Sequence, residues 1–246
     1  MSATPQTYAA LPTMPPADAP APPTAELSVE DYTRVRELCN RLFNQVFQDI
    51  ARTSLPDAAK TLGLAPKGKI PKMPQNLFAL LADFGIYDHY LGGSNALQRF
   101  LKRTPPPTGP LELEVVEAVT HPRFSLYTYV RKLEDNTHLM FDVLHQETCV
   151  FFDTALGNTP MPPSVMLAAR ALPIRGLLMT GGGVMVMPTA LIEILQQRLA
   201  AAGFEDFAAG KPRPRKGERL AEANAVIIKT GLQLAAANAA RQRVVR

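Results

Sequence analysis

Apolar residues recur at steps of three and four positions through the first half of the chain, which is typical of amphipathic helices. The clearest run follows Ser28 and continues to about Arg52, and Ser28 with Asp31 resembles a capping box. Further helices are predicted over residues 54–63, over residues 75–90 and from Ser94 onward. The proline-rich stretch Thr104–Pro110 ends this helical part, because consecutive prolines continue neither a helix nor a central strand.

Beyond the prolines, a pattern with a period of two replaces the helical one. Residues 111–120 fit either a short helix or a strand. Strands are predicted over residues 123–131, 137–144, 148–153, 165–172, 175–180 and 184–187. The three glycines Gly181–Gly183 are expected to form a hairpin turn. Short strands at close spacing predict a small, curved antiparallel sheet or barrel.

Two helices are predicted after the strands, one from Thr189 to Gly203 and an Ala-rich one over residues 218–244. The expected fold class is therefore α+β. We expect four parts: a disordered Pro/Ala-rich leader (1–25), a helical segment (26–103), a small β module with its following helix (111–203), and a basic C-terminal helix (211–246).

The composition is that of a globular protein, with 246 residues, 46% hydrophobic and 20% charged. No apolar run is long enough for a membrane span, and the first residues do not resemble a secretory signal. Cys39 and Cys149 lie far apart, which suits a reducing cytosol, although a single bridge between them stays open. We therefore expect a cytoplasmic protein.

Positive charge is concentrated at one end of the chain. The net charge is +4, but residues 211–246 hold nine basic and two acidic residues, a net charge of +7. The candidate nucleic-acid-binding residues are Lys211, Arg213, Arg215, Lys216 and Arg219. With no aromatic residue in this segment, binding would be electrostatic and independent of base sequence. An acidic protein partner and a merely solubilising helix are the alternatives.

His138, Asp142 and His145 are the clustered residues of metal-ligand type. On a helix they would share one face, and a metal-dependent enzyme would follow. In the predicted strand His138 and Asp142 share a face while His145 points away. This alternative therefore depends on the local structure.

Other catalytic patterns are weaker. Cys149 and His145 are a conceivable nucleophile and base, but the residues around Cys149 predict a buried strand. The chain has no Gly-x-Ser-x-Gly motif, and Gly181–Gly183 are not followed by a Gly-Lys-Ser/Thr motif. No cofactor is predicted. A non-enzymatic binding or adaptor protein is favoured, and an assembly subunit that packs through its Ala-rich terminal helix is a further alternative.

Several short sequence motifs resemble those of a set of uncharacterised bacterial proteins, in which a helical N-terminal segment precedes a compact β module. These motifs are Leu81–Phe84, Arg123–Tyr127, Phe141–Leu144, Asp153, Ala169-Arg170 and Met179–Gly182. The resemblance covers less than half of the chain and excludes the leader and the basic helix. It implies a curved β module and carries over no activity and no functional residue.

Overall fold

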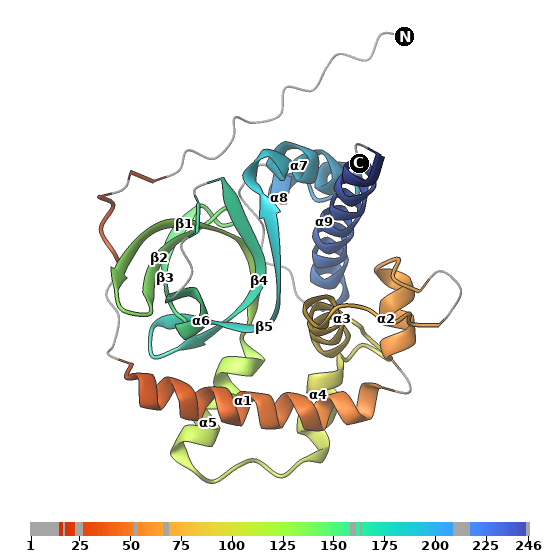
Figure 1. Cartoon of the computed structure of the whole chain (residues 1–246). Helices are drawn as coiled ribbons and strands as arrows, with labels where there is room; N and C mark the ends of the chain where they lie inside the picture. Colours follow the sequence, from red (N-terminus) through yellow and green to blue (C-terminus); the bar gives the residue numbers. More distant parts are fainter. Residues whose placement is uncertain are drawn as a thin grey trace.

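The structure, a computed structural model, describes residues 15–16, 18–22, 27–51, 54–65, 69–157, 161–162, 164–208 and 217–244. Helices surround a ring of strands, and Figure 1 looks along the axis of this ring. The long helix α1 lies along one side of it, and α3 and α9 lie along another. The α+β class predicted from the sequence is confirmed.

The N-terminal helices follow the predicted pattern closely. They are α1 (Val29–Ile50), α2 (Leu55–Thr61), α3 (Gln75–Tyr87), α4 (Ala96–Arg103) and α5 (Pro110–Thr120). Ser28 caps α1 as expected, its hydroxyl accepting the backbone N–H of Asp31 at 3.0 Å. The ambiguous residues 111–120 are helical, because Pro110 opens the helix and its buried residues recur at helical spacing.

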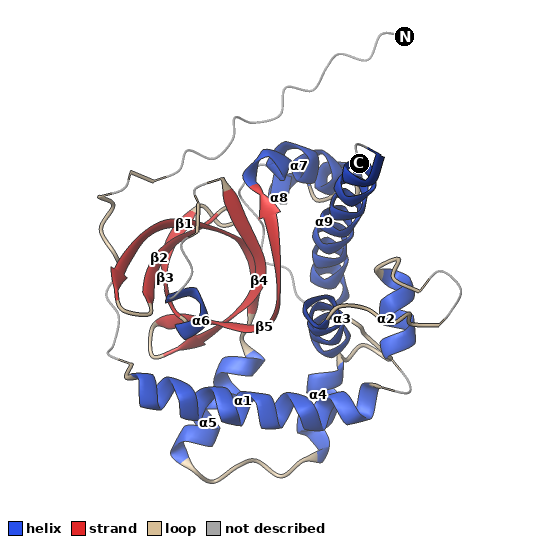
Figure 2. Cartoon of the chain, viewed as in Figure 1, coloured by secondary structure: helices blue, strands red, loops and turns tan. Residues whose placement is uncertain are grey.

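The five strands form a closed barrel in the order β1-β2-β3-β5-β4 (Figure 2). Their bounds are β1 Arg123–Glu134, β2 Thr137–Asp142, β3 Glu147–Phe152, β4 Val165–Ile174 and β5 Leu177–Pro188. Four of the neighbouring pairs are antiparallel. The purely antiparallel prediction was wrong at one seam, where β3 and β5 run parallel and pair at Phe151 and Leu178. The sheet is therefore mixed.

The barrel separates two apolar clusters. Its interior is filled by Tyr127, Met140, Phe151 and their neighbours, and the rings of Tyr127 and Phe151 lie 4.8 Å apart edge to face. Its outer surface packs against the helices and contributes to the larger cluster. Alternation along each strand produces this division, because successive side chains point to opposite faces.

The predicted turn at the three glycines is wrong: β5 continues through Gly181–Gly183 without a break. The physical reason is the helix beside it. A Cβ added to Gly183 would collide with backbone atoms of Leu80, so α3 lies directly on the strand backbone. The glycines therefore provide a close approach between a helix and a strand, not a change of chain direction.

The remaining elements are α6 (Thr154–Gly157), a 3-10 turn (Thr189–Leu191), α7 (Ile192–Ala201), α8 (Glu205–Ala208) and α9 (Glu218–Val244). The first half of α9 packs into the protein, with Ile227 and Ile228 fully buried. Most of the predicted disordered leader lies outside the described residues; within it, Ala19 is buried and its carbonyl accepts Arg131. Among the described residues, none of the helices has the length and hydropathy of a membrane span.

The close approach of α3 to β5 generates a stability prediction. We expect Gly183→Ala to lower the free energy of unfolding by about 1–3 kcal/mol, because the added methyl group meets helix backbone that cannot move aside. Chemical denaturation of both proteins measures this difference.

Gly182→Ala is the matched control, since residue 182 is exposed and the nearest atom to its new Cβ, Asp83 Oδ1, is 3.7 Å away. Its stability should stay within about 0.5 kcal/mol of the wild-type value. Equal losses in the two variants would contradict the packing described here.

Candidate functional site

The basic residues predicted to bind nucleic acid divide into two groups. Lys211, Arg213, Arg215 and Lys216 lie outside the described residues. Arg219 is described and makes internal contacts: it pairs with Glu222 at 2.5 Å, donates to the Gly203 carbonyl at 3.1 Å and stacks over the Phe204 ring at 4.1 Å. Arg219 therefore holds α9 against the turn between α7 and α8.

The structure brings together two of the three residues considered as alternative metal ligands. His145 follows β2 in a turn, and its Nδ1 lies 3.0 Å from Asp142 Oδ2, so the expectation that it points away was wrong. His138 is four residues along the strand from Asp142, about 13 Å at the usual rise. Across the described ranges, no three His, Cys, Asp or Glu side chains are arranged to hold a metal ion.

Asp142 is the acceptor centre of a polar cluster at one end of the barrel. It accepts the Ser125 hydroxyl at 2.5 Å and the backbone N–H of Leu144 and His145 at 3.1 Å each. Burial alone would raise the pKa of Asp142, but the bonds and charge of His145 and the Ser125 bond outweigh it and lower the pKa. The cluster therefore stabilises the carboxylate that closes this turn.

The order of groups in this cluster does not fit nucleophilic catalysis. The carboxylate of Asp142 lies between the Ser125 hydroxyl and the His145 ring, whereas an activated serine needs the imidazole between hydroxyl and carboxylate. Cys149 points into the barrel, its Sγ 3.7 Å from the Met140 carbonyl, and burial raises the pKa of its thiol. A buried thiol of raised pKa is a poor nucleophile.

His138 is the most buried histidine and the least satisfied. It is 3% exposed, and neither ring nitrogen has a hydrogen-bond partner within the described residues. Its ring lies 5.8 Å from that of Tyr129, and burial, with the nearby Lys132, lowers its pKa. The histidine is therefore held in its neutral form.

Arg170 forms a buried polar cluster between β4, α3 and α9. Its Nε lies 3.0 and 3.2 Å from the two carboxylate oxygens of Asp83, and its Nη2 pairs with Asp88. Asn224 donates to the other oxygen of Asp88 at 2.9 Å, and the Tyr87 ring lies 4.2 Å from the guanidinium. The single guanidinium of Arg170 thus pairs with two carboxylates in a buried site.

The excess of carboxylates changes their protonation. Burial raises the pKa of Asp83 to about 6, although Arg170 opposes the shift, and Asp88 adds a further increase through its negative charge. The pKa of Asp88 is also raised by burial. Burial therefore outweighs the attraction of Arg170 and holds the pKa of both carboxylates above its usual value.

A third cluster joins α1 to the barrel. Arg36 donates to the backbone carbonyl and, at 2.7 Å, to the hydroxyl of Thr180, and reaches Asp153 at 3.3 Å. The other oxygen of Asp153 accepts the backbone N–H of Ala155 at 2.9 Å at the start of α6. The hydrogen bonds of Arg36 and Asp153 thus position α1 and α6 against the barrel.

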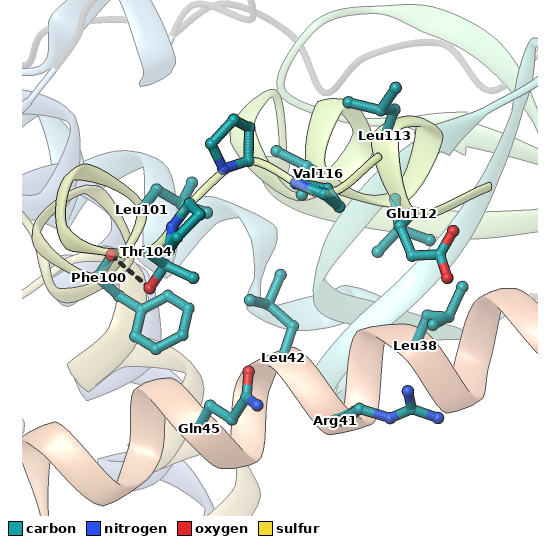
Figure 3. Close-up of a pocket in the computed structure, with 14 residues that line it drawn as sticks. Leu38, Arg41, Leu42, Gln45, Phe100, Leu101, Thr104, Glu112, Leu113 and Val116 are labelled. Atoms are coloured by element: carbon teal, nitrogen blue, oxygen red, sulfur yellow. Dashed lines mark hydrogen bonds between the residues drawn. The ribbon is translucent and has the colours of Figure 1, made fainter. Parts of the chain in front are cut away.

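An apolar pocket lies away from all three clusters, between α1 and the chain segment that connects α4 to α5 (Figure 3). Its volume is about 320 Å³. The lining residues are Leu38, Arg41, Leu42 and Gln45 of α1; Phe100 and Leu101 of α4; Thr104–Pro107 of the connection; and Glu112, Leu113, Val115 and Val116 of α5. Four chain segments thus bound the pocket, and its polar groups are few.

Ion pairs fix the walls of this pocket to its floor. Arg103 of α4 pairs with Asp49 of α1. Arg175, in the turn between β4 and β5, bonds Glu114 of α5 and Asp31 of α1, both at 2.9 Å. Such exposed pairs each contribute little energy, and they connect the helices at the edges of the pocket.

A second cleft, of about 440 Å³, lies between α9 and the end of α3. Glu218, Glu222 and Lys229 line it with charges of both signs. Asp88 also reaches it, but both of its oxygens are already bonded to Arg170 and Asn224. The apolar pocket is therefore the better candidate for a ligand site.

Sequence reasoning missed both the pocket and the buried clusters. The pocket joins residues of α1 to residues that are 55 to 78 positions later in the chain. The buried clusters could have been anticipated from the sequence. Several of the short apolar segments that carry the resemblance contain one charged residue, namely Asp83, Asp142 and Arg170. A polar residue inside a short apolar segment indicates a buried group that needs a hydrogen-bond partner.

Comparison with known proteins identifies one relationship. The model of a family of unknown function (DUF7986) matches residues 26–203, nearly three quarters of the chain. No curated protein and no solved structure matches the chain. The match includes the helices that form the pocket and the whole barrel, and it ends before α8 and α9.

The Arg170 cluster generates a prediction about pH. The pKa of Asp83 is about 6 in the folded chain and near 3.8 when exposed, so the folded state binds more protons between these values. Stability supplied by protonated Asp83 is therefore lost as pH rises through about 6. Compared with Asp83→Asn, which cannot titrate, the wild-type protein should lose free energy of unfolding between pH 4 and about 7.

Denaturation at several pH values measures this difference. Asp135→Asn is the control, since Asp135 is exposed and its pKa is lowered by Lys132, which gives the opposite sign. A wild-type stability that stays parallel to that of Asp83→Asn across the range would show that Asp83 is ionised throughout.

Proposed function

We propose that this chain, which belongs to the DUF7986 family, is a non-enzymatic binding protein whose ligand site is the apolar pocket between α1, α4 and α5. The observation that carries the proposal is the pocket itself. Its volume of about 320 Å³ falls within the usual range of small-molecule sites, and its lining is mainly apolar.

The shape of the pocket favours a small molecule over a helix or an extended peptide. A docked helix is about 10 Å wide and needs a groove that is open at both ends. Here the connection Thr104–Gly109 and α1 face each other across the pocket, with α4 and α5 at its sides. A short apolar molecule fits between these four boundaries.

Pre-formed walls support this proposal. The ion pairs of Arg103 and Arg175 tie α4 and α5 to α1. Three consecutive prolines, Pro105–Pro107, restrict the backbone of the connection. A site that is already ordered loses little conformational entropy when a ligand binds.

The polar clusters support a binding role over catalysis. The side chains at the centres of the three clusters form hydrogen bonds with neighbouring elements of the protein, and none of them lines the apolar pocket; they are Asp142, Arg170 and Asp153. Cys39 and Cys149 are both free and buried, which suits a reducing compartment. We therefore also propose a cytoplasmic location.

Filling the pocket tests the proposal. The uncharged fluorophore 2-naphthol, whose roughly eleven heavy atoms match the pocket volume, should bind the wild-type protein with increased emission of its neutral form, and Val116→Phe should weaken this binding at least about tenfold, because the ring occupies the ligand volume. Fluorescence titration gives both dissociation constants.

Val186→Phe is the matched control: the same substitution at a valine that is 65% exposed and outside the pocket. It should leave the affinity unchanged. Binding that survives Val116→Phe, in a variant with an unchanged circular dichroism spectrum, would place the probe elsewhere.

Nucleic-acid contact through the basic segment is the second candidate, and the charge of +7 over residues 211–246 supports it. Removing residues 211–246 is not a clean test, because Asn224 and Ile227 of α9 belong to the buried interior. Charge must be removed by substitution. An assembly role for the last turns of α9 stays a prediction, since side chains 237–246 lie outside the described residues.

We expect a variant with four substitutions to glutamine, at Lys211, Arg213, Arg215 and Lys216, to bind double-stranded DNA more weakly at low salt. The slope of the logarithm of its binding constant against the logarithm of salt concentration should become shallower by up to about 0.9 for each lost phosphate contact. Filter binding at several salt concentrations measures both quantities. The control removes the same charge elsewhere, at Arg34, Lys60, Lys102 and Lys132. Equal effects of the two variants would mean that net charge, and not this segment, attracts DNA.

A further inference from the structure

We infer that the apolar pocket selects an uncharged amphiphile: a short alkyl chain that carries a hydroxyl or ester group in place of an ionised one. This inference rests on the proposed function and specifies the ligand class. It follows from the charges, the hydrogen-bonding groups and the volume of the pocket, taken in that order.

The charged groups on the pocket walls oppose each other. Arg41 on α1 and Glu112 on α5 both line it, and both are exposed at its edge. An anionic head group attracted by Arg41 would be repelled by Glu112, and a cationic one would meet the reverse. Neither ion gains a net electrostatic advantage that offsets the loss of its hydration.

The hydrogen-bonding groups suit a neutral head group. The hydroxyl of Thr104 is already used, since it donates to the Phe100 carbonyl at 3.0 Å. Gln45 is exposed, and Figure 3 shows its amide rising from α1 on the side of Phe100. An amide both donates and accepts, so it can bond a hydroxyl or an ester carbonyl equally well.

The volume limits the alkyl chain. At about 30 Å³ for each heavy atom, the share of a water molecule in the liquid, 320 Å³ holds on the order of ten heavy atoms. The apolar surface offered by Leu38, Leu42 and Val116 extends through this volume. Each methylene group should therefore tighten binding about fourfold until the pocket is full.

The experiment compares octanol, octanoate and octylammonium at pH 7 in displacement of 2-naphthol from the full-length protein. Octanol should bind at least about tenfold more tightly than either ion, because only the ions lose hydration without compensation. Hexanol and heptanol should extend the series downward in steps of about fourfold.

Two conservative variants make the test specific. Glu112→Gln leaves Arg41 unopposed, so octanoate should bind several-fold more tightly and octylammonium more weakly. Arg41→Gln should produce the reverse. Both side chains are exposed, so the variants are expected to fold, and the quantity compared is the ratio of the octanoate affinity to the octylammonium affinity in each variant.

The possible results separate the inference from the proposed function. If octanoate or octylammonium competes as well as octanol, or if the charge variants leave the ions unaffected, the uncharged ligand class is wrong while the pocket remains a site. If neither the fluorophore nor octanol binds, the proposed function itself fails. Preference for octanol together with opposite responses of the two ions supports both.

Discussion

The contact of Arg170 with Asp83 and Asp88 is the constraint on which the arrangement of this protein depends. It joins the barrel strand β4 to α3, and Asn224 extends it to α9. Removing one partner from a buried charged pair leaves an uncompensated charge, which costs several kcal/mol. The three elements must therefore dock together, and the direction of each approach is set by hydrogen bonds rather than by apolar contact alone.

The same region shows why the glycines of β5 are required. Asp83 reaches Arg170 only because α3 lies against the strand, and Gly183 permits that distance by having no side chain toward Leu80. At Gly231 of α9, an added Cβ would meet the side-chain ends of Met185 and Met187, which can move. The approach of α3 is thus rigid, and that of α9 is adjustable.

Sequence patterns predicted most of the elements and few of the contacts between them. The cap at Ser28 and the last helix were predicted correctly, because these features depend on neighbouring residues. The path through Gly181–Gly183 was not, because glycine is equally suited to a turn and to a close approach, and only α3 decides between them. The position of His145 beside Asp142 likewise depends on where β2 ends, one of the least reliable features of a sequence pattern.

The candidate site was beyond sequence reasoning for a different reason. Leu42 and Val116 belong to separate helices, and each fits an ordinary apolar stripe. Nothing local distinguishes a stripe that is covered by a neighbouring helix from one that lines an opening. That distinction arises from the span of the proline-containing connection between α4 and α5.

The bond between Asn224 and Asp88 also orders events during synthesis. Its two residues are 136 positions apart, so the ribosome must make the barrel and α7 before the donor for Asp88 exists. Until then, the carboxylate of Asp88 in the nascent chain has Arg170 as a partner but not Asn224. Helix α9, which lies outside the family match, is therefore made after the barrel, and its arrival completes an interior formed by residues translated long before it.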